Sequence, residues 1–258
     1  MIRRFLLSCF ILVVTGTLAM AKDVRFVQVA EAMYTKDKSA KLEKCIEDIN
    51  TLKKIDFVVF TGDNIAVAKK ENLKGFLKLV RRLDAPVYLV IGDKDVSKSK
   101  GLNKEVYREE AFKMLGWGQS LDSNYVFKKK NLVFIVVDGA REFVPSGNGY
   151  YKQDTLDWLD SQLTKYKDKQ VVLIQHFPLI DGPVIERNAY KIQLYRDLLA
   201  RHSNVLAVVS GHYNNQLEIS EYGFLNIVTP SYSQTNDYKI FDIPENRDFV
   251  YTQLRTVE

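Results

Sequence analysis

The strongest constraint on the fold is a set of short runs in which nearly every residue is apolar. Phe57–Phe60 and Leu132–Val137 are the clearest of these runs. A strand that is apolar at every position presents apolar side chains on both sides, and such strands are typically covered on both faces of their sheet. The chain therefore has to pack other elements against both faces of a sheet, which restricts it to a layered architecture.

Helical patterns alternate with these runs from one end of the chain to the other. The early part indicates a βαβαβ order, and the later part adds hairpins such as Gln216–Val228 around Tyr222-Gly223. We therefore predict an α/β fold of the α+β type, with two packed mixed β-sheets flanked by helices. The expected strands are Val24–Ala30, Phe57–Thr61, Val87–Ile91, Tyr125–Phe127, Leu132–Val137, Val171–Gln175, Ala207–Ser210, Gln216–Ser220, Phe224–Val228 and Phe249–Gln253. The expected helices are Lys41–Lys54, Leu73–Leu83, Lys104–Leu115, Thr155–Tyr166 and Ala189–Arg201.

The first residues have the pattern of a secretory signal peptide. Arg3 and Arg4 precede an apolar stretch from Phe5 to Val14, and Ala19-Met20-Ala21 matches a small-x-small cleavage site. We expect residues 1–21 to be removed and the protein to be exported, to the periplasm or the medium, with no stable membrane insertion after cleavage. An uncleaved N-terminal membrane anchor is the alternative, although the apolar stretch is short for a full span.

The remaining residues, 22–258, are predicted to form a single domain. Their composition is that of an ordinary globular protein, because the chain of 258 residues is 46% hydrophobic and 27% charged. Without the two arginines of the leader, 35 basic and 32 acidic residues remain, a net charge of +3. This charge is too small and too scattered to indicate a nucleic-acid partner.

Carboxylate and imidazole side chains follow four of the predicted strands. In an open α/β fold, ligands gather at the C-terminal ends of the strands. Asp63, Asp93, His176 and His212 each stand directly after a predicted strand end or its glycine. A mixture of His and carboxylate ligands suits a borderline metal ion such as zinc, manganese or iron. Each residue alone has an ordinary explanation, a turn or a packed histidine, but the four together predict a metal site.

The order of these motifs resembles that of the calcineurin-like metallophosphoesterase superfamily, which includes purple acid phosphatases and cyclic-nucleotide phosphodiesterases. That family is marked by strand-Gly-Asp, strand-Gly-Asn-His, strand-His and strand-Gly-His-x-His. The chain has Gly62-Asp63, Gly92-Asp93, His176 and Gly211-His212 in this order. The helix Asp154–Leu163 also resembles the helix that precedes the family's His-Pro motif. The resemblance extends from about Val24 to Val228, and it implies a phosphoric ester hydrolase with this family's two-sheet fold.

Several motif positions depart from the family pattern. The opening Asp-x-His is replaced by Glu31 and Met33, and the last His is replaced by Asn214. The Asn-His pair is replaced by Asp93-Lys94. In the family, one metal is held by the opening Asp and His, a bridging Asp and the final His, so three positions that belong to this site are altered here. The ligands of the other metal are largely kept.

The resemblance thus implies a reduced centre. We expect one divalent transition metal, zinc, manganese or iron, held by Asp63, Asp93, His176 and His212, and a chain that binds no metal is the alternative. Two-metal hydrolases use both ions to stabilise the phosphoryl group, so a one-metal centre needs another source of positive charge. Lys94 stands where the family has its catalytic His, and a lysine could supply that charge. Glu31 could act as a base or a weak ligand. A solvated lysine is the competing interpretation of Lys94.

The loop Gly139–Tyr151 borders the substrate cleft by resemblance, so Arg141 could meet a phosphate and Tyr150 could stack on a base or a sugar. Both residues could equally be part of the loop's own packing. The predicted function is an exported metallophosphoesterase-like protein that hydrolyses or binds a small phosphate ester. A catalytically inactive relative that serves as a binding or scaffold module is the alternative. The sequence indicates no protein partner.

Overall fold

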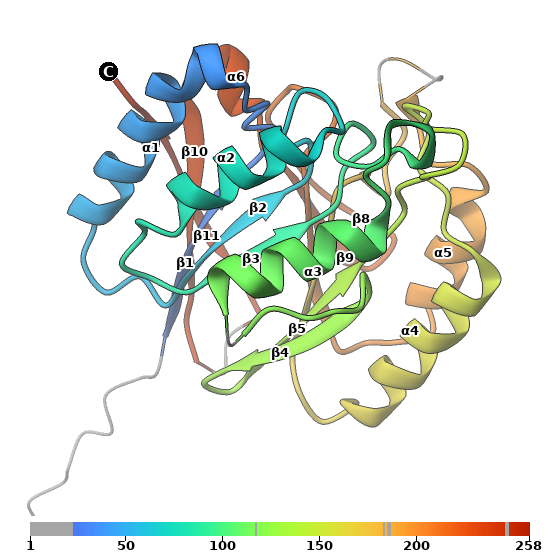
Figure 1. Ribbon diagram of the computed structural model, residues 1–258. Coiled ribbons are helices and arrows are strands. Elements are labelled where there is room, and N and C mark those ends of the chain that lie inside the picture. The colour runs from blue at the N-terminus through green and yellow to red at the C-terminus, as the bar shows by residue number, and fades with distance from the viewer. Residues whose placement is uncertain (1–22, 117, 183, 185–186, 246–247) are drawn as a thin grey trace, which may run out of the picture.

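The computed structural model describes residues 23–116, 118–182, 184, 187–245 and 248–258. The predicted signal peptide, residues 1–21, lies outside the described residues. The structure consists of two β-sheets with helices on the outer faces, which confirms the predicted fold class (Figure 1). No helix in the described part of the chain is both long and apolar enough to span a membrane.

Both sheets are mixed. The first contains β1 (Val24–Val29), β2 (Phe57–Thr61), β3 (Val87–Val90), β10 (Asp237–Ile243) and β11 (Tyr251–Thr256), in the order β11-β10-β1-β2-β3. The second contains β4 (Tyr125–Lys129), β5 (Leu132–Val137), β6 (Val171–Gln175), β7 (Val205–Ser210), β8 (Leu217–Glu221) and β9 (Phe224–Val228), in the order β4-β5-β6-β7-β9-β8. The strands β1, β2 and β3 are parallel to one another, as are β5, β6, β7 and β9. Antiparallel strands extend both sheets at their edges.

Alternate residues of the central strands separate into two cores. Phe26, Phe57 and Phe134 point between the two sheets, where the Phe26 and Phe57 rings stack with centroids 4.6 Å apart. Their neighbours, such as Val27 and Val58, pack against the helices instead. Because both faces of these strands are buried, their sequences are continuous apolar runs.

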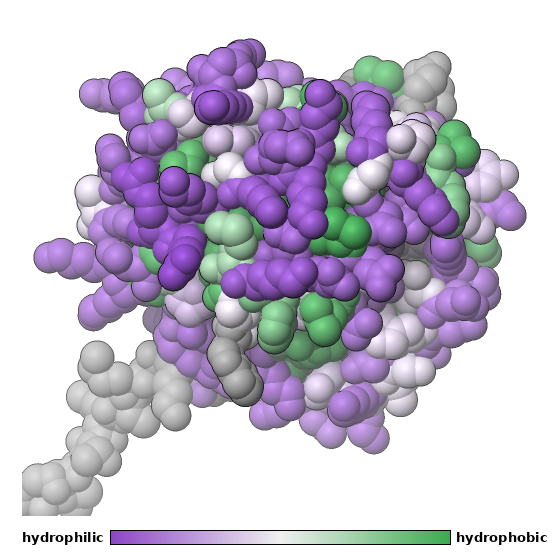
Figure 2. Space-filling view, in the orientation of Figure 1, coloured by the Kyte–Doolittle hydropathy of each residue, from purple (hydrophilic) through white to green (hydrophobic). Residues whose placement is uncertain are grey.

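The helices lie in two groups on the outer faces. The group of α1 (Ser39–Thr51), α2 (Lys70–Val80) and α3 (Lys104–Leu115) covers one side, while α4 (Gln153–Lys165) and α5 (Ile192–Leu199) cover the other (Figure 1). The short elements η1 (Lys36–Lys38), η2 (Lys98–Lys100) and α6 (Tyr232–Thr235) lie in the connections. The surface that carries α2 and α3 is mostly hydrophilic, with small apolar patches between the helices (Figure 2).

The sequence analysis missed β10, which lies between β1 and β11. The polar residues of Asp237–Ile243 obscure its strand pattern, and Lys239 in its middle is completely buried. The Lys239 ammonium donates to the Glu218 carboxylate of β8, in the other sheet. A buried lysine is tolerated only with such a partner, and a sequence alone does not reveal a partner from another sheet.

Candidate metal centre

The predicted ligands come from strand ends of both sheets. Asp63 and Asp93 follow β2 and β3 of the first sheet, and His176 and His212 follow β6 and β7 of the second. All of these strands are parallel within their sheets, so their C-terminal ends lie along one edge of each sheet. The packing of the two sheets brings both edges to one place.

Three of the four predicted ligands converge. The Nε2 atom of His176 lies 3.1 Å from Oδ1 of Asp93 and 3.1 Å from Nδ1 of His212. Nδ1 of His212 lies 3.3 Å from the same Asp93 oxygen. Asp93, His176 and His212 therefore form a compact group whose ligand atoms all lie within 4.8 Å of one another.

The other nitrogen of each imidazole is held by a backbone carbonyl. Nδ1 of His176 is 2.8 Å from the Thr61 carbonyl oxygen, and Nε2 of His212 is 3.0 Å from that of Arg187. A carbonyl only accepts, so both of these nitrogens carry the hydrogen, and the two nitrogens that face Asp93 present lone pairs. Three acceptors thus point at one spot, which a cation or a proton has to occupy. This donor set fits a borderline divalent ion, and carbonyl-fixed imidazoles are usual in such sites.

The carboxylates around His176 set the charge of this spot. Burial opposes a charge on His176, but the carboxylates of Asp63 and Asp93 outweigh burial and raise its pKa to about 9. Burial likewise opposes the charge on Asp93, yet the two neighbouring histidines hold the pKa of that carboxyl far below its usual range. Without a metal, the three acceptors therefore share a proton at neutral pH, which a bound metal ion displaces.

Asp63, the fourth predicted ligand, lies beside this group and binds Lys94. Oδ1 of Asp63 is 3.6 Å from Nε2 of His176, and it accepts a 2.9 Å hydrogen bond from the Lys94 backbone nitrogen. The Lys94 ammonium donates to Oδ2 of the same carboxylate. Both oxygens of this fully buried side chain are therefore engaged by one residue. The sequence left open whether Lys94 is solvated. In the structure, its side chain is directed toward the centre and binds Asp63.

Glu31 and Asn214, which replace two first-site ligands, contact each other. With the Asn214 amide oriented to satisfy its neighbours, its nitrogen donates to Oε1 of Glu31 at 3.2 Å and its oxygen accepts from Arg187 at 3.2 Å. Burial raises the pKa of Glu31, which is only 3% exposed. The Met33 side chain is half-buried, and its backbone nitrogen donates to the Asp63 carbonyl at 2.9 Å.

Arg187 was not found by the sequence analysis. Its guanidinium also donates to the His212 carbonyl, and His212 Nε2 donates to the Arg187 carbonyl. Two reciprocal hydrogen bonds therefore link these residues. Arg187 lies in an irregular segment between β6 and α5. That segment has no recognisable motif, and no local signal in it could have identified the residue.

Tight backbone geometry accompanies the centre. Glu31, Met33, Asp63, His212 and Asn214 all have positive φ angles, between 49° and 68°. This left-handed backbone conformation is strained for residues other than glycine, and such residues cluster at functional sites. Asp95, also missed by the sequence analysis, links the loops that follow β2 and β3. Its carboxylate accepts hydrogen bonds from the backbone nitrogens of residues 65 and 92.

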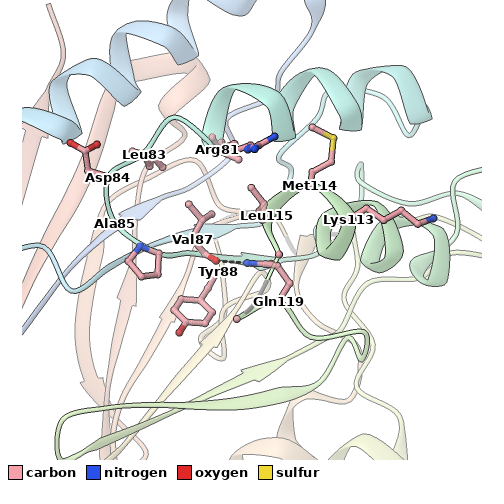
Figure 3. Close-up of a pocket in the computed structure, with 14 residues that line it drawn as sticks. Arg81, Leu83, Asp84, Ala85, Val87, Tyr88, Lys113, Met114, Leu115 and Gln119 are labelled. Carbon is pink, nitrogen blue, oxygen red and sulfur yellow. Dashed lines mark hydrogen bonds between the residues drawn. The ribbon is translucent and has the colours of Figure 1, made fainter.

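Arg141 and Tyr150 lie together, in a different pocket. With Tyr190 they line a pocket of about 330 Å³, and none of the metal-centre residues described above lines it. Their predicted contact with a substrate stays a prediction. A pocket of about 410 Å³ does open on the centre, at Asp93 and Lys94. A larger one of about 520 Å³, shown in Figure 3, lies around Val87 at the start of β3, the end of that strand that is opposite to Asp93.

Comparisons with known proteins match this site and fold. The sequence profile described as calcineurin-like phosphoesterase matches residues 29–215, a range that contains every motif position. A probable glycerophosphodiester phosphodiesterase of Arcobacter nitrofigilis is 30% identical over 66% of this chain and 61% of its own length. A probable cyclic nucleotide phosphodiesterase of Fibrobacter succinogenes is 20% identical over 70% of this chain and 66% of its own length. The chain thus matches less than two thirds of the length of these curated relatives.

A solved structure shares the fold at low sequence identity. The crystal structure of a dimetal phosphatase from Danio rerio superposes with a TM-score of 0.71, at 16% identity, over 91% of this chain and 96% of its own.

Proposed function

This chain belongs to the calcineurin-like phosphoesterase family, and from that membership we propose that it hydrolyses a phosphate ester at a centre for one divalent metal ion. The observation that carries the proposal is the convergence of Asp93, His176 and His212 beside two protein cations, Lys94 and Arg187. The three ligands suit zinc, manganese or iron, with Asp63 as the neighbouring fourth oxygen donor.

The protein cations support a single metal ion. Lys94 engages both oxygens of Asp63, the position that bridges the two metals in the family. Arg187 binds Asn214, which stands in place of a first-site ligand. A second divalent ion on this side would have to displace the Lys94 ammonium from Asp63. Competition with this ion pair therefore disfavours a second ion.

Each residue has a role in the proposed reaction. The metal ion would act as a Lewis acid that polarises the phosphoryl group and lowers the pKa of water. His176 and His212 orient their lone pairs through the carbonyls of Thr61 and Arg187. The Lys94 side chain is 37% exposed, so its ammonium can contact both Asp63 and a phosphoryl oxygen and stabilise the charge of the transition state. Glu31 is only 3% exposed, and we propose that its carboxylate balances the positive charge of Arg187.

A phosphodiester is the substrate class that best fits this centre. A diester carries one negative charge on its phosphoryl group, one fewer than a monoester dianion, and so it requires less compensating charge. The printed names of both curated relatives, each a probable phosphodiesterase, support the same choice.

Metal content and turnover together test this proposal. We expect the purified protein, incubated with Zn²⁺, Mn²⁺ or Fe²⁺ and then desalted, to keep about one equivalent of metal by plasma mass spectrometry. We expect it to hydrolyse bis(4-nitrophenyl) phosphate faster than 4-nitrophenyl phosphate. The variant Lys94→Met should lower kcat roughly 100-fold, the usual effect of losing one group that stabilises transition-state charge. Lys128→Met, which removes a lysine stacked on Tyr166, is the control.

Each other result has a defined meaning. Absence of bound metal would contradict the centre itself. Two equivalents in the wild type would contradict the role of the protein cations. One equivalent of metal without turnover of either ester would assign the chain a binding role instead.

Export is a separate part of the proposal. The leader pattern of residues 1–21 supports secretion with cleavage after Ala21. N-terminal sequencing of protein from a secreting host should therefore begin at Lys22. A product that starts at Met1 and sediments with membranes would support the uncleaved anchor.

A further inference from the structure

The centre is exposed at two residues that line a pocket, Asp93 and Lys94. The side chains of Asp63 and His176 are fully buried, and His212 and Glu31 are nearly so. By contrast, Asp93 is 13% exposed and Lys94 is 37% exposed. Both line the pocket of about 410 Å³ described above. An ester whose phosphoryl group contacts the centre from this side therefore places part of its organic portion in this pocket.

The lining of the pocket combines polar and cationic side chains with apolar residues, which are Ala66, Val67, Ala68, Val96 and Pro145. Lys94 and Lys100 supply positive charge, and Ser97, Ser99 and Ser146 supply hydroxyl groups. Asp93 is the only acidic residue among the lining residues, and it faces the histidines. None of the described residues that line the pocket is aromatic. The lysines and hydroxyl groups suit a charged, hydrogen-bonding group, and the described lining has no aromatic side chain on which a flat ring could stack.

Of the two lysines that line the pocket, Lys100 is the one whose ammonium forms no ion pair within the described part of the chain. Lys94 is already paired with Asp63, whereas no carboxylate in the described part of the chain forms an ion pair with Lys100. Lys98, two residues earlier, is not among the residues that line the pocket, and its ammonium lies 4.5 Å from the centre of the Phe143 ring. The neighbouring lysines of η2 thus have different surroundings, and only Lys100 lines the pocket.

We propose that this pocket binds an anionic group, a carboxylate or a second phosphate, on the organic portion of the phosphate ester, and that Lys100 is the residue that selects it. The inference rests on the proposed function, since it assumes that the phosphoryl group contacts the centre. It adds a substrate class, an ester with a second negative charge a few atoms from the phosphorus.

Two phosphonates of similar length test this inference by calorimetry on the full chain loaded with one equivalent of Zn²⁺. The first, 3-phosphonopropionate, carries a carboxylate, and the second, propylphosphonate, ends in a methyl group. We expect the wild type to bind 3-phosphonopropionate about tenfold more tightly, since one added hydrogen bond between charged groups has an effect of this size. Lys100→Met should make the two Kd values equal, and Lys98→Met should leave their ratio unchanged.

The possible results separate the inference from the function on which it rests. Equal affinities in the wild type, or a preference that survives in Lys100→Met, would overturn the role of Lys100 while phosphonate binding still supports the centre. Failure of both phosphonates to bind to a protein that hydrolyses bis(4-nitrophenyl) phosphate would overturn this inference alone. Failure to bind together with absence of that turnover would overturn the proposed function as well.

Discussion

His176→Ala should abolish metal binding and turnover. Nε2 of His176 lies within 3.1 Å of both other converging ligand atoms, so its removal leaves Asp93 and His212, with Asp63 beside them, to hold an ion. Loss of groups that merely orient a ligand weakens metal affinity 10- to 100-fold. Loss of the ligand itself should therefore weaken it by more than about 100-fold. Competition with a fluorescent chelator measures the affinity, and hydrolysis of bis(4-nitrophenyl) phosphate measures turnover.

A second variant separates metal loss from misfolding. His176→Ala also deprives the Thr61 carbonyl of its buried donor, which costs about 1–3 kcal/mol of stability. An amide in His176→Asn can still donate near that carbonyl but has no nitrogen at the Nε2 position, so it should fold like the wild type and still lose the metal. His202→Ala is the matched control, because this histidine pairs with Asp160 at 2.8 Å outside the centre. Wild-type metal affinity in His176→Asn would remove His176 from the ligand set.

Gly62→Ala should destroy the same centre without changing any ligand. Gly62 has a φ of +91°, and a Cβ atom there would lie 2.5 Å from Nδ1 of His176 and 2.9 Å from the Gly92 backbone. The added methyl group would push His176 away from the Thr61 carbonyl. We expect a loss of at least about 3 kcal/mol of stability, from overpacking and backbone strain together, and metal affinity near that of His176→Ala.

Gly101→Ala isolates the contribution of the backbone. Gly101 has a comparable φ of +76°, but no atom lies within 4 Å of its added Cβ. This variant should therefore lose only about 1 kcal/mol and keep full metal affinity. Urea unfolding of both variants measures the difference. If Gly62→Ala behaved like Gly101→Ala, the close contact between Gly62 and His176 would not exist in solution.

The sequence by itself determined the layered fold and the positions of the motifs. Buried strands such as Phe57–Thr61 and Leu132–Val137 were located because burial on both faces leaves a local, continuous apolar pattern. The strand-end rule then placed Asp63, Asp93, His176 and His212 near one another, since parallel strands end along one edge. Both inferences depend on short stretches of chain, which is why a sequence carries them.

Only the tertiary structure decided which charges meet. Arg187 faces His212 and Asn214, and Lys239 of β10 faces Glu218 of β8, across gaps of 21 to 27 residues that no local periodicity connects. The pairing of Lys94 with Asp63 likewise depends on how the loops after β2 and β3 approach each other. A charged side chain is long and flexible, and its partner is fixed by the path of the chain and by burial rather than by neighbouring residues. The protein cations beside the metal ligands, on which the one-metal proposal rests, could therefore be located only in three dimensions.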